Sequence, residues 1–305
     1  MDRTMKHKGW YWAIAALILF QSSDVSLRLA SVQTQFAVGT VLQATPLMLV
    51  ALAAAVRHRI KFRAGLPGRA WSINAAYGLL QFCIGNLLFY AAVQQGGLSI
   101  ASPAVQSQAI WAVVLGGLFL RERISRMMIG GITLFVAGLI LLSWFKSSGA
   151  SVSGTHLWGL ITGILGGLAW AGASAVQSSQ LRQKVPLSYI LAAGSAAGVM
   201  CLHVFILFCY GPSVWATVGA DGALKVLAAG CFNGLAVWCI SQALRFVEIS
   251  KIIPVISLSI VLNTLIGGFW FGEYVNFGSI AGMLIVFCGV ILVQEPKPRG
   301  EFKQI

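Results

Sequence analysis

The chain has 305 residues, of which 58% are apolar and 10% charged, and its mean hydropathy is +0.83. Soluble domains carry about 25% charged residues, so this composition excludes a soluble globular protein and indicates a polytopic membrane protein. A hydrocarbon core of roughly 30 Å needs about 20 apolar residues per helix. The length therefore accommodates about ten membrane-spanning helices joined by short loops.

Ten apolar runs follow one another along the chain. In order, they are Trp10–Arg28, Phe36–Val56, Ala70–Gln94, Leu98–Leu120, Met127–Phe145, Leu157–Ser179, Leu187–Tyr210, Ala223–Leu244, Ile249–Phe271 and Phe277–Gln294. The division between the seventh and eighth runs has the least support, because no charged residue lies between Val185 and Ala220. It depends on Tyr210-Gly211-Pro212-Ser213, a helix-breaking sequence.

The basic residues are distributed unevenly between the two sides that ten spans define. Eighteen of the 21 Lys and Arg residues fall on the side of the termini and the even-numbered loops; Arg28, Lys146 and Lys225 are the other three. The positive-inside rule then predicts a multi-pass protein of the inner (plasma) membrane with both termini in the cytoplasm. A nucleic-acid partner is not expected despite the net charge of +13, because the basic residues flank helices rather than forming one patch.

One stretch of the chain occurs twice with a constant offset of 151 residues. The stretch that begins at Leu98 matches the one that begins at Ile249, and the aligned pairs are Ser99 with Ser250, Pro103 with Pro254, Gly116-Gly117 with Gly267-Gly268, and Glu122 with Glu273. Such self-similarity predicts a transporter built from two halves. The halves are residues 1–147 and 154–295, and residues 296–305 form a cytoplasmic tail. Five spans per half make the repeats inverted relative to each other.

These features resemble the EamA-type proteins of the drug/metabolite transporter superfamily: ten spans, a five-plus-five repeat, an early Pro in the fourth helix of each half, and a Gly pair then Glu at its end. The resemblance implies an all-α membrane protein that carries amino acids, other small metabolites or drugs across a bacterial inner membrane, with export favoured. It also implies a cavity near the bilayer midplane, lined by helices one, three, four, six, eight and nine.

Polar and aromatic side chains in the middle of those helices are the expected substrate-binding residues. They are Asp24, Asn86, Tyr90, Gln106, Trp111, Trp170, Asn233, Trp238 and Ser257. Flat apolar faces, neutral hydrogen-bonding groups and one carboxylate suit a zwitterionic or weakly cationic metabolite such as an amino acid. A phosphate ester would require a buried Arg or Lys, and no mid-span position has one.

Two ionisable residues have alternative interpretations. Asp24 lies four residues before Arg28 on one helical face, so it is either a substrate or proton site facing the cavity or the partner of Arg28 in an intrahelical ion pair. His203 in the seventh span could shuttle protons, or it could form a hydrogen bond to a neighbouring helix.

Four residues are expected to act as hinges or gates. Pro103 and Pro254 remove a backbone donor and disfavour regular helix just before them. Glu122 and Glu273 lie at helix C-termini, where a negative charge opposes the helix dipole, so each is expected to face the next helix N-terminus at Ser125 or Asn276. The first would lie at the cytoplasmic face and the second at the outer face.

The motifs of nucleotide hydrolysis, zinc proteases and serine hydrolases do not occur in the sequence, and its six cysteines lie inside apolar runs without metal-ligand spacing. We therefore expect a secondary transporter that works by alternating access, not an enzyme, without a metal or cofactor. A gradient-independent facilitator or lipid flippase of the same fold is the alternative, and a membrane-embedded enzyme fits less well. The expected partners are a small-molecule metabolite and the bilayer; a coupling proton and a homodimer stay open.

Overall fold

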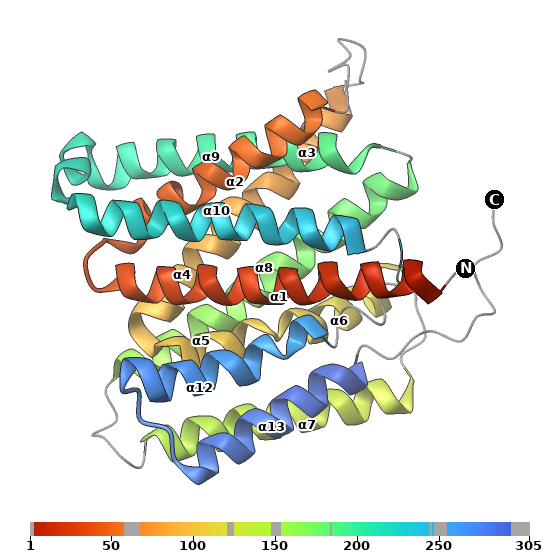
Figure 1. Ribbon diagram of the computed structural model, residues 1–305, viewed down its shortest axis with the longest axis vertical. Helices are drawn as coiled ribbons and strands as arrows, with labels where there is room; N and C mark the ends of the chain where they lie inside the picture. Colours follow the sequence, from red (N-terminus) through yellow and green to blue (C-terminus); the bar gives the residue numbers. More distant parts are fainter. Residues whose placement is uncertain are drawn as a thin grey trace.

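The computed structural model describes residues 3–57, 68–120, 125–147, 154–183, 185–243, 246 and 255–293, and within these ranges the regular elements are helices (Figure 1). In the first half they are α1 (Arg3–Ser31), α2 (Phe36–Arg57), α3 (Gly68–Gly78), the π-helix η1 (Leu79–Gly85), α4 (Asn86–Gly96), α5 (Leu98–Val105), α6 (Gln108–Leu120) and α7 (Arg126–Ser147). In the second half they are α8 (Gly154–Arg182), α9 (Leu187–Tyr210), the 3-10 helix η2 (Pro212–Thr217), α10 (Ala220–Ala243), α12 (Ser259–Phe271) and α13 (Phe277–Val293).

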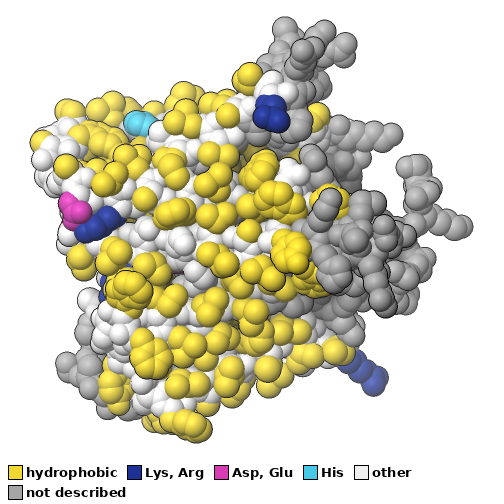
Figure 2. Space-filling model, viewed as in Figure 1, with side chains coloured by type: hydrophobic (Ala, Val, Ile, Leu, Met, Phe, Trp, Pro, Cys, Tyr) yellow, Lys and Arg dark blue, Asp and Glu magenta, His cyan; other side chains and the backbone are white. Residues whose placement is uncertain are grey.

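Ten membrane spans can be counted in this arrangement, as predicted. Within the described residues, seven helices are long and apolar enough to cross a membrane, and the shorter apolar helices Arg126–Leu142, Val255–Phe271 and Phe277–Val293 are the remaining three. The seventh and eighth spans are separated where expected, since α9 ends at Tyr210 and Gly211 follows with φ of +70°. Figure 2 shows a surface that is largely apolar along the helices, with the visible charged side chains near the helix ends, as a protein in a bilayer requires.

The two halves are inverted relative to each other. Helices α7 and α13, the last spans of the two halves, run antiparallel side by side (Figure 1). Their backbones approach so closely that a Cβ added at Gly138 would lie 2.7 Å from the backbone nitrogen of Val286, and one at Gly282 would lie 2.7 Å from that of Leu142. Glycine at such positions allows membrane helices to gain dispersion contacts without a hydrophobic force between them.

The two ends of the bundle are distinguished by the helices that begin and end there. We call the end at which α1 begins and α13 ends the terminal end, and the opposite end, where α1 stops at Ser31 and α2 starts at Phe36, the far end (Figure 1).

Equivalent spans of the two halves are interrupted at equivalent positions. The fourth span breaks at Gln106 and Ser107, between α5 and α6, and the ninth breaks at Leu258, which the repeat offset aligns with Ser107. The expectation of irregular backbone just before Pro103 is wrong, because α5 is helical from Leu98 through Pro103 and the break follows it. Pro254 lies outside the described residues.

Candidate substrate cavity and its closed end

A cavity of about 300 Å³ lies between the two halves. Its described lining residues are Phe20, Asp24, Gln43, Leu47, Tyr77, Gln81, Phe82, Asn86, Phe89, Ser102, Val105, Gln106, Gln108, Trp170, Leu191, Asn233, Val237, Ile256 and Ser259. They come from every span except the fifth and the tenth, so α2 and α9 contribute in addition to the six helices expected. Leu191 and Val237 lie near the terminal ends of α9 and α10, so the cavity extends toward that end.

The described part of the lining is uncharged except for the Asp24 carboxylate. Among the described residues it contains no Lys or Arg, and it combines amide side chains with the aromatic rings of Phe20, Phe89 and Trp170. Ligand pockets that bind small organic molecules commonly join apolar walls with a few polar groups of this kind.

Asp24 is held by the second half of the protein. Its Oδ2 accepts a 2.7 Å hydrogen bond from the Asn263 amide of α12, and the same amide donates at 3.1 Å to the Ser102 hydroxyl of α5. Arg28 pairs instead with Glu273, at 3.3 Å between Nε and Oε1. The intrahelical Asp24–Arg28 ion pair is therefore not formed in this structure, although the two residues share a face of α1.

The third span is remodelled where it meets the cavity. Its middle turn is the π-helix η1, and the Gln81 carbonyl there accepts a 3.1 Å hydrogen bond from the Trp170 indole. A Cβ at Gly85 would lie 2.2 Å from that indole, so glycine makes the space that Trp170 occupies. Short π-helical turns inside α-helices often mark functional sites.

Five of the nine expected binding residues line the cavity: Asp24, Asn86, Gln106, Trp170 and Asn233. Tyr90, four residues after Asn86, does not. It is fully buried and its hydroxyl is 2.8 Å from that of Thr34. Its ring packs against Gly39 of α2, where an added Cβ would lie 2.5 Å from the ring carbon Cζ. Whether any of these residues binds substrate stays a prediction.

Trp111, Trp238 and Ser257 are also absent from the cavity lining. Trp238 is 41% exposed and meets the Trp12 ring edge-on, at 5.2 Å between centroids. Asn233 and Val237 are one turn apart on the cavity face of α10, and the 100° step to the next residue turns Trp238 away. Ser257 is buried just before the break in the ninth span, after which Ser259 faces the cavity.

The far end of the structure is closed by a contact between halves that we call the outer latch, comprising Glu273, Arg28 and the α5 N-terminus. The Glu273 carboxylate accepts hydrogen bonds from the backbone N–H groups of Leu98 and Ser99, at 2.9 and 3.0 Å, and from the Ser99 hydroxyl. Its side chain is only 6% exposed. A carboxylate at this point satisfies orphan donors of the first helical turn and complements the helix dipole.

The expectation that Glu273 faces the helix that follows it is therefore wrong. That helix, α13, is capped by Asn276, whose Oδ1 accepts a 2.8 Å hydrogen bond from Ser279 N–H. Glu273 instead reaches the other half, where Gly97 leaves room for it: a Cβ at Gly97 would lie 2.2 Å from the carboxylate. Glu122 lies outside the described residues.

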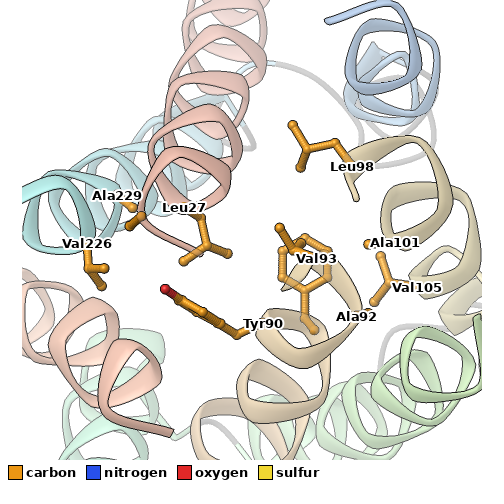
Figure 3. Close-up of a cluster of buried hydrophobic side chains, with 11 residues drawn as sticks. Leu27, Tyr90, Ala92, Val93, Leu98, Ala101, Val105, Val226 and Ala229 are labelled. Carbon is orange, nitrogen blue, oxygen red and sulfur yellow. The ribbon is translucent and has the colours of Figure 1, made fainter. Parts of the chain in front are cut away.

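A buried apolar cluster (Figure 3) includes Phe89 and Val105 of the cavity lining and Leu98, whose backbone N–H belongs to the outer latch. Leu27 of α1, Tyr90 and Val93 of α4, Leu98 of α5 and Val226 of α10 converge there, each 3% exposed or less. Opening the far end must separate these side chains and break the latch, so both hold the far end closed.

His203 is remote from this region. Its Nδ1 is 2.8 Å from the Val199 carbonyl of its own helix, and its ring stacks on Trp215 with centroids 5.8 Å apart. Neither contact is the expected hydrogen bond to a neighbouring membrane helix.

Several residues that contact Asp24 or line the cavity were not among the expected ones, notably Gln43, Gln81, Ser102 and Asn263. A polar amide inside an apolar span is a visible signal at Gln43 and Asn263. The pairing of Asn263 with Asp24 joins positions 239 residues apart, and the sequence of one chain holds no sign of it.

The inverted ten-helix bundle with a cavity between its halves defines a multi-pass membrane transporter fold. The EamA-like transporter family matches the chain twice, over residues 7–144 and 157–294, and the chain belongs to that family. The two matches fall on the two repeats. The predicted family is thereby confirmed.

Two individual proteins are similar to parts or all of the chain. A probable 4-amino-4-deoxy-L-arabinose-phosphoundecaprenol flippase subunit ArnE from Pseudomonas paraeruginosa (strain DSM 24068 / PA7) is 36% identical over 89 residues, which are 26% of this chain and 74% of that protein. A solved crystal structure of a protein with no stated function superposes with a TM-score of 0.63 at 18% identity, covering 96% of this chain and 98% of the other. The second likeness concerns the fold alone.

Proposed function

We propose that this chain is an inner-membrane secondary transporter that exports a small zwitterionic or weakly cationic metabolite, an amino acid or a related compound, by alternating access. The observation that carries this proposal is the cavity lining, with the Asp24 carboxylate among neutral amides and aromatic rings. A carboxylate in a site of low polarity attracts an ammonium group, and aromatic faces favour a cation further.

The distribution of basic residues supports an orientation in which the cavity extends toward the cytoplasm. With the termini in the cytoplasm, the far end faces the periplasm, the outer latch closes that side, and the cavity extends toward the cytoplasm. An exporter takes up its cargo in such a state. Release then requires the latch to open and the terminal end to close.

A lipid flippase is the second candidate, and the similarity to the flippase subunit ArnE favours it. A lipid-linked phosphate would call for Lys or Arg at the binding site. The described lining of the cavity contains neither, so we prefer the small cationic cargo. The lack of paired acids or an activated nucleophile in the sequence weighs against an enzyme.

Transport by purified protein in proteoliposomes tests the proposal. A panel of labelled amino acids and small amines is offered to wild type, Asp24→Asn, and the surface control Asp221→Asn. Because a charge-assisted hydrogen bond contributes about 1.5–3 kcal/mol, we expect Asp24→Asn to lower uptake of the transported compound ten- to hundredfold, with Asp221→Asn near wild type. Equal uptake by all three proteins would refute the role of Asp24, and translocation of fluorescent lipid without uptake of any amine would establish the flippase.

A further inference from the structure

Asn263 is a fully buried amide that joins three helices from both halves. Both of its N–H donors are used, one by Asp24 of α1 and one by Ser102 of α5. Its Oδ1 is buried without a hydrogen-bond partner. An ionised carboxylate only accepts hydrogen bonds, so the amide presents its nitrogen to Asp24, and its oxygen is left on the side without a donor.

The same three segments meet again at the outer latch. Arg28 lies one turn beyond Asp24 on α1, Ser99 lies one turn from Ser102 on α5, and Glu273 follows the end of α12. Along α1 the chain runs toward the far end, and α5 starts there, so both steps lead in the same direction. The contacts around Asn263 and the outer latch are therefore two successive layers that tie α1, α5 and α12 together.

The layer around Asn263 depends on charge. A hydrogen bond to an ionised group contributes about twice as much as one between neutral groups. When a cationic group of the cargo neutralises Asp24, the bond from Asn263 weakens, and the amide retains an unpaired oxygen that opposes its burial. The layer that faces the cavity then holds the three helices less tightly, and the outer latch and the apolar cluster remain to keep them together.

We infer that Asn263 is a positioning residue that aims the Asp24 carboxylate and couples its occupancy to the opening of the outer latch. The inference rests on the proposed function in one respect, because it takes the binding of a cationic group of the cargo to Asp24 as the event that triggers opening. Asn263 does not line the cavity, so it acts through Asp24 and not by touching cargo.

Opening of the far end can be measured without knowing the cargo, and the compound found in the uptake panel supplies the transport readout. In a variant whose six cysteines are replaced, Val105→Cys places one thiol on the cavity wall behind the latch. A membrane-impermeant maleimide applied to the periplasmic side of intact cells labels this thiol only when the far end opens. The proteins compared are Asn263→Ala, Asp24→Asn, the matched control Thr264→Val, and the swap of Asp24→Asn with Asn263→Asp. Thr264 is a buried neighbour whose hydroxyl bonds only to the Ile260 carbonyl of its own helix.

We expect Asn263→Ala and Asp24→Asn to be labelled about tenfold faster than the parent, and Thr264→Val at the parent rate. The swap preserves an amide–carboxylate pair between α1 and α12, so it should restore slow labelling while transport stays lost, because the cavity no longer holds a carboxylate. Labelling of Asn263→Ala at the parent rate overturns the coupling, and so does equally fast labelling of Thr264→Val or a swap that stays fast. If Asn263→Ala does not accumulate, Asp24→Asn and the swap decide the matter alone. Loss of transport in Asp24→Asn with unchanged labelling would overturn the coupling and leave the proposed function standing.

Discussion

Gly97→Ala should open the far end more than a Gly→Ala substitution at any other described glycine. Gly97 has φ of +72° and ψ of 176°, a region that only glycine enters readily, so alanine is strained there by about 1–3 kcal/mol. Its Cβ would also lie 2.2 Å from Oε1 of Glu273 and expel the carboxylate from the α5 N-terminus. Each charge-assisted hydrogen bond that is lost contributes about 1.5–3 kcal/mol, and hydrogen bonds to water replace part of this stabilisation when the far end opens.

Together these effects should shift the balance toward the open far end by about 3 kcal/mol, or roughly a hundredfold. The assay is maleimide labelling of the Val105→Cys reporter from the periplasmic side, with the melting temperature of the purified protein as a second readout. Gly130→Ala is the matched control, because a Cβ at this exposed position of α7 meets nothing within 4 Å. If Gly97→Ala labels and melts like Gly130→Ala, then Glu273 does not hold the far end closed.

Three further outcomes are expected from the same contacts. Gly85→Ala should displace the Trp170 indole and lower transport at least tenfold without unfolding the protein. Uptake and size-exclusion chromatography would check this, and normal uptake would show that Trp170 does not belong to the binding site. Gly282→Val should separate α13 from α7 at Leu142 and destabilise the protein by about 2–3 kcal/mol in thermal unfolding, and an unchanged melting temperature would contradict the close packing. A reporter active only in the periplasm should be silent when fused after Val293, whereas strong activity would show that the C-terminus lies in the periplasm and that the predicted topology is wrong.

The sequence was a good guide to the helices because membrane spans are defined locally. Each span needs an apolar run of sufficient length, and the predicted break after Tyr210 was also correct, since Gly211 and Pro212 end a helix for reasons confined to a few residues. The repeat could also be predicted, because a fixed offset between Leu98 and Ile249 is visible without any structure.

The partners of the polar residues could not be predicted in the same way, because they depend on helix rotation and on which helices meet. Asp24 and Arg28 share a face of α1, yet each pairs with a residue of the second half, Asn263 and Glu273. The direction of Trp238 was misjudged because five residues along a helix turn it by 140° from Asn233. The π-helix η1 in the third span and the interruption of the ninth span also change which residues of those spans face the cavity.

An experimental structure of the protein with its transported compound bound would test the central claim most directly. We predict density for the compound inside the cavity, with its ammonium group about 3 Å from the Asp24 carboxylate and its apolar part against Phe89 or Trp170. A compound bound at the lipid-facing surface, or inside the cavity with no contact to Asp24, would contradict the account.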